Sequence, residues 1–86
     1  MKELEKILKA LANKRRLAIL KYLKKAGRAP VADIAEAIDL SFKSTSKHLS
    51  ILLSADILEK QQSALRMFYY LSAPQKSPAK HIIELL

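Results

Sequence analysis

The repeat of the apolar residues changes once along this chain, and that change limits the folds the chain can adopt. Up to Ser54, apolar side chains recur every three or four residues, as they do in α-helices that bury one face. After Asp56, two short β-prone runs follow, "ILEKQQ" and "RMFYYLS", separated by "SAL". The sequence therefore predicts a mainly helical fold with one small β-hairpin.

Two helical segments are expected in the first third of the chain. The first spans about Glu3 to Leu11, where leucine and isoleucine recur with helical spacing. Asn13 is the expected N-cap of the second segment, and Gly27 is expected to end it in a left-handed conformation. The inward face of the second segment is formed by Leu17, Ile19, Leu20 and Leu23.

Two more helices are expected before the hairpin, and one after it. Pro30 opens a short third segment, and Ser41 is the expected N-cap of a fourth helix over residues 43–54. After the hairpin and the linker "APQKSP", Ser77 is the expected cap of a last helix with Pro78 at its first position. The predicted order is α-α-α-α-β-β-α, in a single domain over residues 1–86.

The fourth helix has two chemically different sides. When its residues are projected at 100° each, Lys43, Lys47, Ser50 and Ser54 lie on one side, with Ser46 beside them. The opposite side carries Thr45, Leu49, Leu52 and Leu53. The leucine side is expected to face the core, which leaves the serines and lysines available for a partner.

The charge of the chain favours an anionic partner. Sixteen lysines and arginines against eight acidic residues give a net charge of +8. Such an excess attracts nucleic acid first and acidic membrane surfaces second, although it also serves solubility. There is no cysteine, and the N-terminal "MKELEKILKAL" lacks the apolar run of a signal peptide or membrane span. We therefore expect a soluble cytoplasmic protein with no membrane partner.

A short third helix, a tight turn, a polar-faced fourth helix and a hairpin together form a winged helix-turn-helix. A helix fits the major groove of B-DNA, and its N-terminal amides favour a phosphate. Arg66, just past the tip of the wing, is placed to reach a phosphate or the adjacent minor groove. The expected partner is double-stranded DNA.

Three stretches of the sequence resemble the ArsR/SmtB family of winged-helix repressors. They are "LANKRRLAILKYL", "VADIAEAIDLSFKSTSKHLSILLSADIL" and "ALRMFYYLS", and the resemblance runs from about Leu8 to Ser72. It implies a homodimeric, sequence-specific repressor with one recognition helix per half-site. With Arg66 added, the predicted DNA-binding residues are Ser41, Phe42, Lys43, Ser44, Ser46, Lys47, Ser50 and Arg66.

The resemblance also bears on four residues outside the predicted DNA-binding set. Arg16 matches a family arginine, which implies either a salt bridge to a nearby acid or a phosphate contact. His48 falls at a family position on the flank of the core and is expected to be structural. Asp39 and Asp56 stand where the family prefers glycine, and aspartate tolerates the left-handed conformation such turns need.

Metal sensing is common in this family. The positions of the family's cysteine pair hold Pro30 and Ala32, so a thiolate site is impossible. His81 and Glu84 match half of a second family site on the last helix, and the missing half falls at Phe68 and Tyr70. We expect a solvated histidine beside a glutamate, no metal and no cofactor, and no effector is predicted from the residues.

The last helix is unusually apolar at its end, with Ile82, Ile83, Leu85 and Leu86. It either folds back on its own domain or, together with the first helix, forms a dimer surface, and we favour the dimer. No catalytic motif is present, so no enzyme activity is expected. The alternative function is a winged helix that binds protein or RNA in a larger assembly, with Phe42 as a possible anchor.

Overall fold

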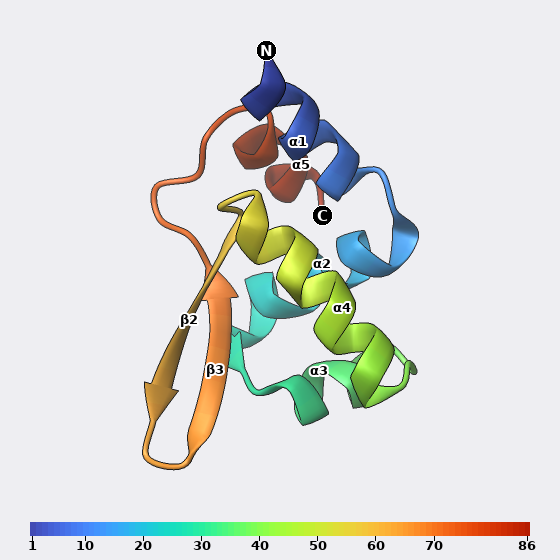
Figure 1. Ribbon diagram of the computed structural model, residues 1–86, viewed down its shortest axis with the longest axis vertical. Coiled ribbons are helices and arrows are strands. Elements are labelled where there is room, and N and C mark those ends of the chain that lie inside the picture. The colour runs from blue at the N-terminus through green and yellow to red at the C-terminus, as the bar shows by residue number, and fades with distance from the viewer.

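The computed structural model describes all 86 residues as five helices and a three-stranded sheet. In chain order, the elements are α1 (Lys2–Leu11), α2 (Lys14–Ala26), β1 (Arg28–Ala29), α3 (Val31–Ala37), α4 (Phe42–Ser54), β2 (Leu58–Ser63), β3 (Arg66–Leu71) and α5 (Ala79–Leu85). Figure 1 shows α1 and α5 together at one end of the molecule, with the β2–β3 hairpin extending from the other. The predicted winged helix-turn-helix fold is confirmed.

The signals that begin and end the helices act largely as expected. The Asn13 side chain accepts hydrogen bonds from the amides of Arg15 and Arg16, at 2.9 and 3.1 Å. The Ser41 hydroxyl accepts one from the Ser44 amide at 3.1 Å, and Gly27 ends α2 with φ of 86°. The expected Ser77 cap is wrong: α5 begins at Ala79 after Pro78, and no side chain caps it.

The sheet has one strand more than the sequence predicted. β1 is two residues long and pairs antiparallel with β3, Arg28 opposite Tyr70 and Ala29 opposite Tyr69. The strand order is β1-β3-β2, so the hairpin is joined to the segment between α2 and α3. Two residues cannot display an alternating pattern, so sequence periodicity could not reveal this strand.

Three turns use a non-glycine residue in the left-handed region. Asp39 ends the α3–α4 turn with φ of 54°, and Asp56 follows α4 with φ of 60°, at the two positions where the sequence suggested it. In the wing, Ser63 pairs with Arg66, so the turn consists of Ala64 and Leu65. Ala64 is the third left-handed residue, with φ of 57°. The turn is one residue shorter than the predicted "SAL".

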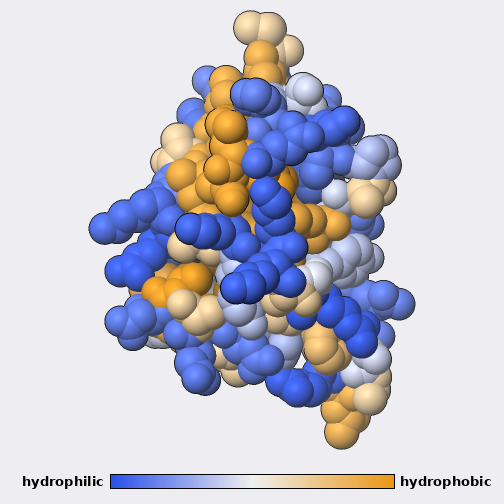
Figure 2. Space-filling model, turned by 180° about the vertical axis from the view of Figure 1, so that it is seen from behind, coloured by the Kyte–Doolittle hydropathy of each residue, from blue (hydrophilic) through white to orange (hydrophobic).

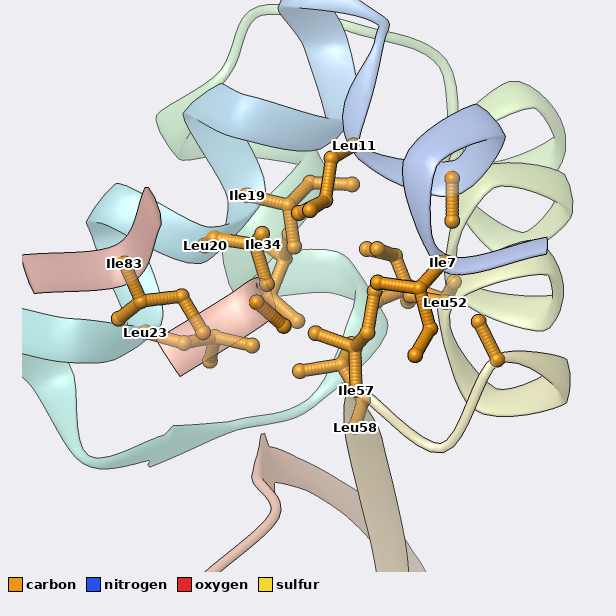
Figure 3. Packing of buried hydrophobic residues seen from close by; sticks show 14 of the residues in the cluster. Ile7, Leu11, Ile19, Leu20, Leu23, Ile34, Leu52, Ile57, Leu58 and Ile83 are labelled. Atoms are coloured by element: carbon orange, nitrogen blue, oxygen red, sulfur yellow. The ribbon is translucent and has the colours of Figure 1, made fainter. Parts of the chain in front are cut away.

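The core lies between the helices and the base of the wing (Figure 3). Its fully buried members come mainly from α2, α3, α4 and β2, and include Ile19, Leu20, Leu23, Ile34, Leu49, Leu52, Ile57 and Leu58. Ala79 and Ile83 of α5 belong to the same cluster. Part of the C-terminal segment therefore folds back on its own domain.

Basic side chains of α2 bind the C-terminal carbonyls of three other helices. Arg15 donates to Ile38 after α3, Arg16 to Lys9 and Ala10 in α1, and Lys24 to Ile83 and Glu84 in α5. Positive charge is favourable at these helix ends because the unpaired carbonyls carry partial negative charge. The three side chains tie α1, α3 and α5 to the central helix.

Candidate nucleic-acid interface

The helix α4 is fixed in the domain by one side. Thr45, Leu49 and Leu52 are fully buried on that side, against the core formed with α2 and α3. The buried positions follow helical spacing, so Lys47, Ser50 and Ile51 between them are exposed, while Ser46 and His48 on the flanks are half-buried. The side predicted to carry serines and lysines is thereby held at the surface on a rigid element.

The predicted DNA-binding residues divide into groups in space. Seven of the eight are exposed, and Ser46 is half-buried: the exposed ones are Ser41, Phe42, Lys43, Ser44, Lys47, Ser50 and Arg66. The first four are consecutive and form the exposed N-terminal turn of α4. Phe42 is 61% exposed, which is unusual for a large apolar side chain and marks it for contact with a partner.

Arg66 lies beside this N-terminal turn. Together with Phe42 and Met67 it lines a shallow pocket against the start of α3. Its guanidinium is 3.9 Å from the Asp33 carboxylate, and both side chains are more than half exposed, so this contact is weak. The structure therefore brings the wing and the start of α4 together, as the predicted site requires.

A second arginine on the wing was missed by the sequence analysis. The Arg28 guanidinium lies 4.5 Å from the centre of the Phe68 ring, and that of Arg66 lies 5.8 Å from the same ring. The ring attracts both cations and holds them near one another. Arg28 comes from β1, so no signal in the sequence linked it to the wing.

Lys47 and Ser50 lie farther along α4 and turn toward α1. They line a groove with Lys6, Lys9 and Arg16, residues that the sequence analysis did not connect with α4. The predicted site is thus not one patch. It consists of the N-terminal turn of α4 with the wing, and a basic groove along the second half of the helix.

Arg16 and His48 connect α4 to the rest of the domain. Arg16 Nη1 is 3.1 Å from His48 Nδ1, and its other nitrogens bind α1 carbonyls. Of the two roles expected for Arg16, the salt bridge to an acid is therefore wrong, because carbonyl oxygens and the imidazole take its donors. Arg16 can only donate, so His48 Nδ1 is the acceptor in this contact. Burial, and next the charge of Arg16, lower the pKa of His48.

The two residues considered as metal ligands on α5 are not joined by further ligands. His81 and Glu84 are exposed, and no group of three or more histidine, aspartate or glutamate side chains is close enough to share an ion. In addition, no helix has the length and apolar character needed to cross a bilayer.

The geometry defines a class of protein, a winged helix-turn-helix with an exposed polar recognition helix. A profile of the helix-turn-helix domain family matches residues 11–61. The arsenical resistance operon repressor of Bacillus subtilis (strain 168) is 32% identical over 72 residues, which cover 84% of this chain and 69% of that protein.

Solved structures agree with this assignment. HlyU from Vibrio cholerae N16961 superposes with a TM-score of 0.81 at 32% identity, covering 96% of this chain and 86% of HlyU. The homodimeric winged helix-turn-helix DNA-binding domain of Mb0332 from Mycobacterium bovis gives 0.84 at 28% identity, covering 98% and 74%. The chain belongs to the ArsR family of winged helix-turn-helix repressors. It is a DNA-binding regulator of transcription and not an enzyme.

Proposed function

We propose that this protein acts as a homodimer and represses transcription by placing α4 of each protomer in the major groove of an operator half-site. The observation that carries this proposal is the N-terminal turn of α4, where Ser41 to Ser44 are all exposed while the opposite side of the helix is buried. The N-terminal end of a recognition helix is the part that reaches base edges in this class of fold.

The chemistry of that turn suits base contacts of two kinds. Lys43 can donate to the O6 and N7 atoms of guanine, and the serine hydroxyls can donate or accept. Phe42 has no polar atom, so its favourable contact in the major groove is the methyl group of thymine. We therefore propose half-sites that contain both a guanine and a thymine next to it.

The wing supplies contacts to the DNA backbone in this proposal. Arg66 and Arg28 carry positive charge on one face of the wing, and neither is held in a strong ion pair. Phosphate contacts position a protein on DNA without reading sequence. We assign this role to the wing, and base reading to α4.

The dimer is supported by an exposed apolar patch that we define as Met1, Leu4, Leu8 and Leu85, from the ends of the chain. Their exposures are 98%, 40%, 48% and 71%. Figure 2 shows apolar surface gathered over the end of the molecule that holds α1 and α5. Contiguous apolar surface of this kind marks an interface, and two-fold dimers are the most frequent solution. We propose that α1 and α5 form this interface in a single-domain, cytoplasmic protein.

Selection of bound sequences from random duplex DNA tests the proposal. We expect a two-fold symmetric site, and we expect Lys43→Ala, Ser46→Ala and Lys47→Ala to reduce discrimination between that site and random duplex about tenfold. Lys25→Ala, on the exposed end of α2, is the control and should leave this discrimination unchanged. Full discrimination in all three α4 variants would mean that another element reads the DNA.

Single-stranded RNA is titrated in parallel. Equal affinity for RNA and selected duplex would favour the RNA-binding alternative instead. Binding should weaken steeply with salt, since lysine and arginine contacts release counterions from DNA.

A further inference from the structure

A groove between α1 and α4 shares Lys47 and Ser50 with the predicted DNA-binding residues, and the function derived so far gives it no ligand of its own. Its volume is about 470 Å³, within the range of small-molecule sites. Its lining consists of Lys6, Lys9, Ala10, Arg16, Lys47, Ser50, Ile51 and Ser54. No acidic residue and no histidine belong to this lining, so it does not suit a metal ion or an organic cation.

The cations of the groove are largely unpaired. Lys6, Lys9 and Lys47 form no salt bridge, and their amino groups form no hydrogen bond within the protein. Arg16 is different, because its guanidinium is fixed by α1 carbonyls and His48. The groove thus contains one positive charge held by hydrogen bonds and three without a partner in the protein, which together favour an anion.

The floor of the groove is apolar. It contains Ala10 of α1 and Ile51 of α4, and Ile51 is 37% exposed, whereas Leu49 and Leu52 of the same helix are fully buried. The aliphatic stems of the lysines extend this surface. A purely ionic ligand such as phosphate would leave this floor uncovered, whereas a ligand with a hydrocarbon part would cover it.

The two ends of the groove differ in charge. Beyond Ser54 the surface continues into a hollow in which two acidic residues, Glu3 and Asp56, are balanced by Lys2 and Lys6. The other end is lined by Lys9, Arg16 and Lys47, and Arg16 contacts His48 there. An anionic group is therefore favoured at the Lys9 and Lys47 end, and the hydrocarbon part along Ile51.

From this arrangement we propose that the groove binds an organic monoanion with a hydrocarbon body, such as a medium-chain or aromatic carboxylate, and that this ligand competes with DNA. Lys47 belongs to both the groove and the proposed reading side of α4, so a carboxylate that pairs with it removes a cation from DNA binding. The competition rests on the proposed function; the binding itself does not.

The test is a titration of the full chain with decanoate, followed by methyl and amide NMR. We expect saturable binding, with the largest shifts at Ile51 and Ala10. Acetate has the charge without the tail, and decanol the tail without the charge, so both should bind at least tenfold more weakly. Lys9→Gln should weaken decanoate binding about fivefold, and Lys25→Gln, which removes the same charge from the last turn of α2, should not.

Competition is measured by fluorescence anisotropy of labelled duplex DNA. Decanoate should displace wild-type protein, and Lys9→Gln should require more decanoate. The proposal is overturned if decanoate leaves DNA binding unchanged, if the shifts are confined to Leu8 and Leu85 of the apolar patch, or if acetate or decanol binds equally well. It is also overturned if duplex DNA alone perturbs Lys6 and Lys9, which would assign the groove to the DNA backbone. Failure of the proposed function would appear separately, as wild-type protein that binds no duplex in the absence of decanoate.

Discussion

At the scale of single residues, α4 has two polar side chains whose burial is energetically unfavourable. The Thr45 hydroxyl is fully buried and has no hydrogen-bond partner. The His48 ring is half-buried beside cations from α2 and from its own helix. Both residues lie on the inner side or flank of α4, so each affects the stability of the helix that carries the DNA-binding residues.

Thr45→Val is expected to stabilise the domain. The substitution keeps the shape of the side chain and removes an unpaired buried hydroxyl, which is worth about 1 kcal/mol. For a domain of this size, the expected rise in Tm is about 4–8 °C, measured by thermal unfolding. Thr45→Ser is the control: it keeps the hydroxyl, removes a methyl group and should lower Tm. A lower Tm in Thr45→Val would show that the hydroxyl has a partner.

His48 is expected to make stability fall in mild acid. Its pKa is lowered in the folded state, first by burial and then by the charge of Arg16, so the unfolded chain binds the proton more tightly. The free energy of unfolding should therefore be level above the ordinary histidine pKa and fall as pH decreases through 6.5 and below. Protonation on Nδ1 would also break the Arg16 hydrogen bond.

Denaturant unfolding between pH 7.5 and 5 measures this dependence. His48→Gln should flatten the profile in that window. His81→Gln, which replaces the only other histidine, should keep it. A profile that is unchanged by His48→Gln would contradict the assignment.

At the scale of elements, the position of the wing depends on three contacts with two others, β1 and α3. The strand β1 pairs with β3, Arg28 and Arg66 share the Phe68 ring, and Asp33 of α3 approaches Arg66. The wing is therefore held by strand pairing with β1 and lies next to α3, beside the start of α4. The pairing keeps the proposed backbone contacts close to the proposed base contacts.

Arg66→Ala is expected to weaken binding to all duplex sequences by a similar factor. One phosphate contact contributes about 0.9 to the slope of log affinity against log salt, so the slope should become smaller by about that amount. Asp33→Asn should act in the opposite direction, because it removes a negative charge beside Arg66. Anisotropy titrations at several salt concentrations measure both. A loss confined to the selected operator would assign Arg66 to base reading instead.

At the scale of the whole molecule, the two ends of the domain have different surfaces. The α1 and α5 end carries the apolar patch of Met1, Leu4, Leu8 and Leu85, and the other end carries the wing and the start of α4 (Figure 1). Lys76 and Glu3 form a 2.8 Å ion pair that links the segment before α5 to α1. This arrangement suits a dimer in which the recognition helices stay free for DNA.

Leu8→Glu is expected to shift the protein from dimer to monomer, because a charge in a buried apolar interface is costly. Light scattering at several protein concentrations measures the shift. The dissociation constant of the dimer should rise at least tenfold. Leu65→Glu is the matched control, since Leu65 is 96% exposed at the wing tip, away from the patch. Loss of the dimer in the control, or its persistence in Leu8→Glu, would place the interface elsewhere.

The local elements follow from the sequence alone, because their signals are local. Helical spacing located α1, α2, α3 and α4, while Asn13 and Ser41 marked two starts by capping the first free amides of their helices. Asp39 and Asp56 marked two turns through their tolerance of positive φ. The same spacing separated the buried and exposed sides of α4, and family resemblance gave the class of function.

Contacts between residues far apart in the sequence depend on the tertiary structure. The strand β1 exists because β3 lies beside it, and Arg16 binds α1 carbonyls and His48 rather than an acid. The groove of Lys9, Lys47 and Ile51 joins residues from opposite ends of the chain's first two-thirds. Such contacts depend on how packed helices cross, and helix crossing is set by the fit of whole surfaces rather than by any local pattern.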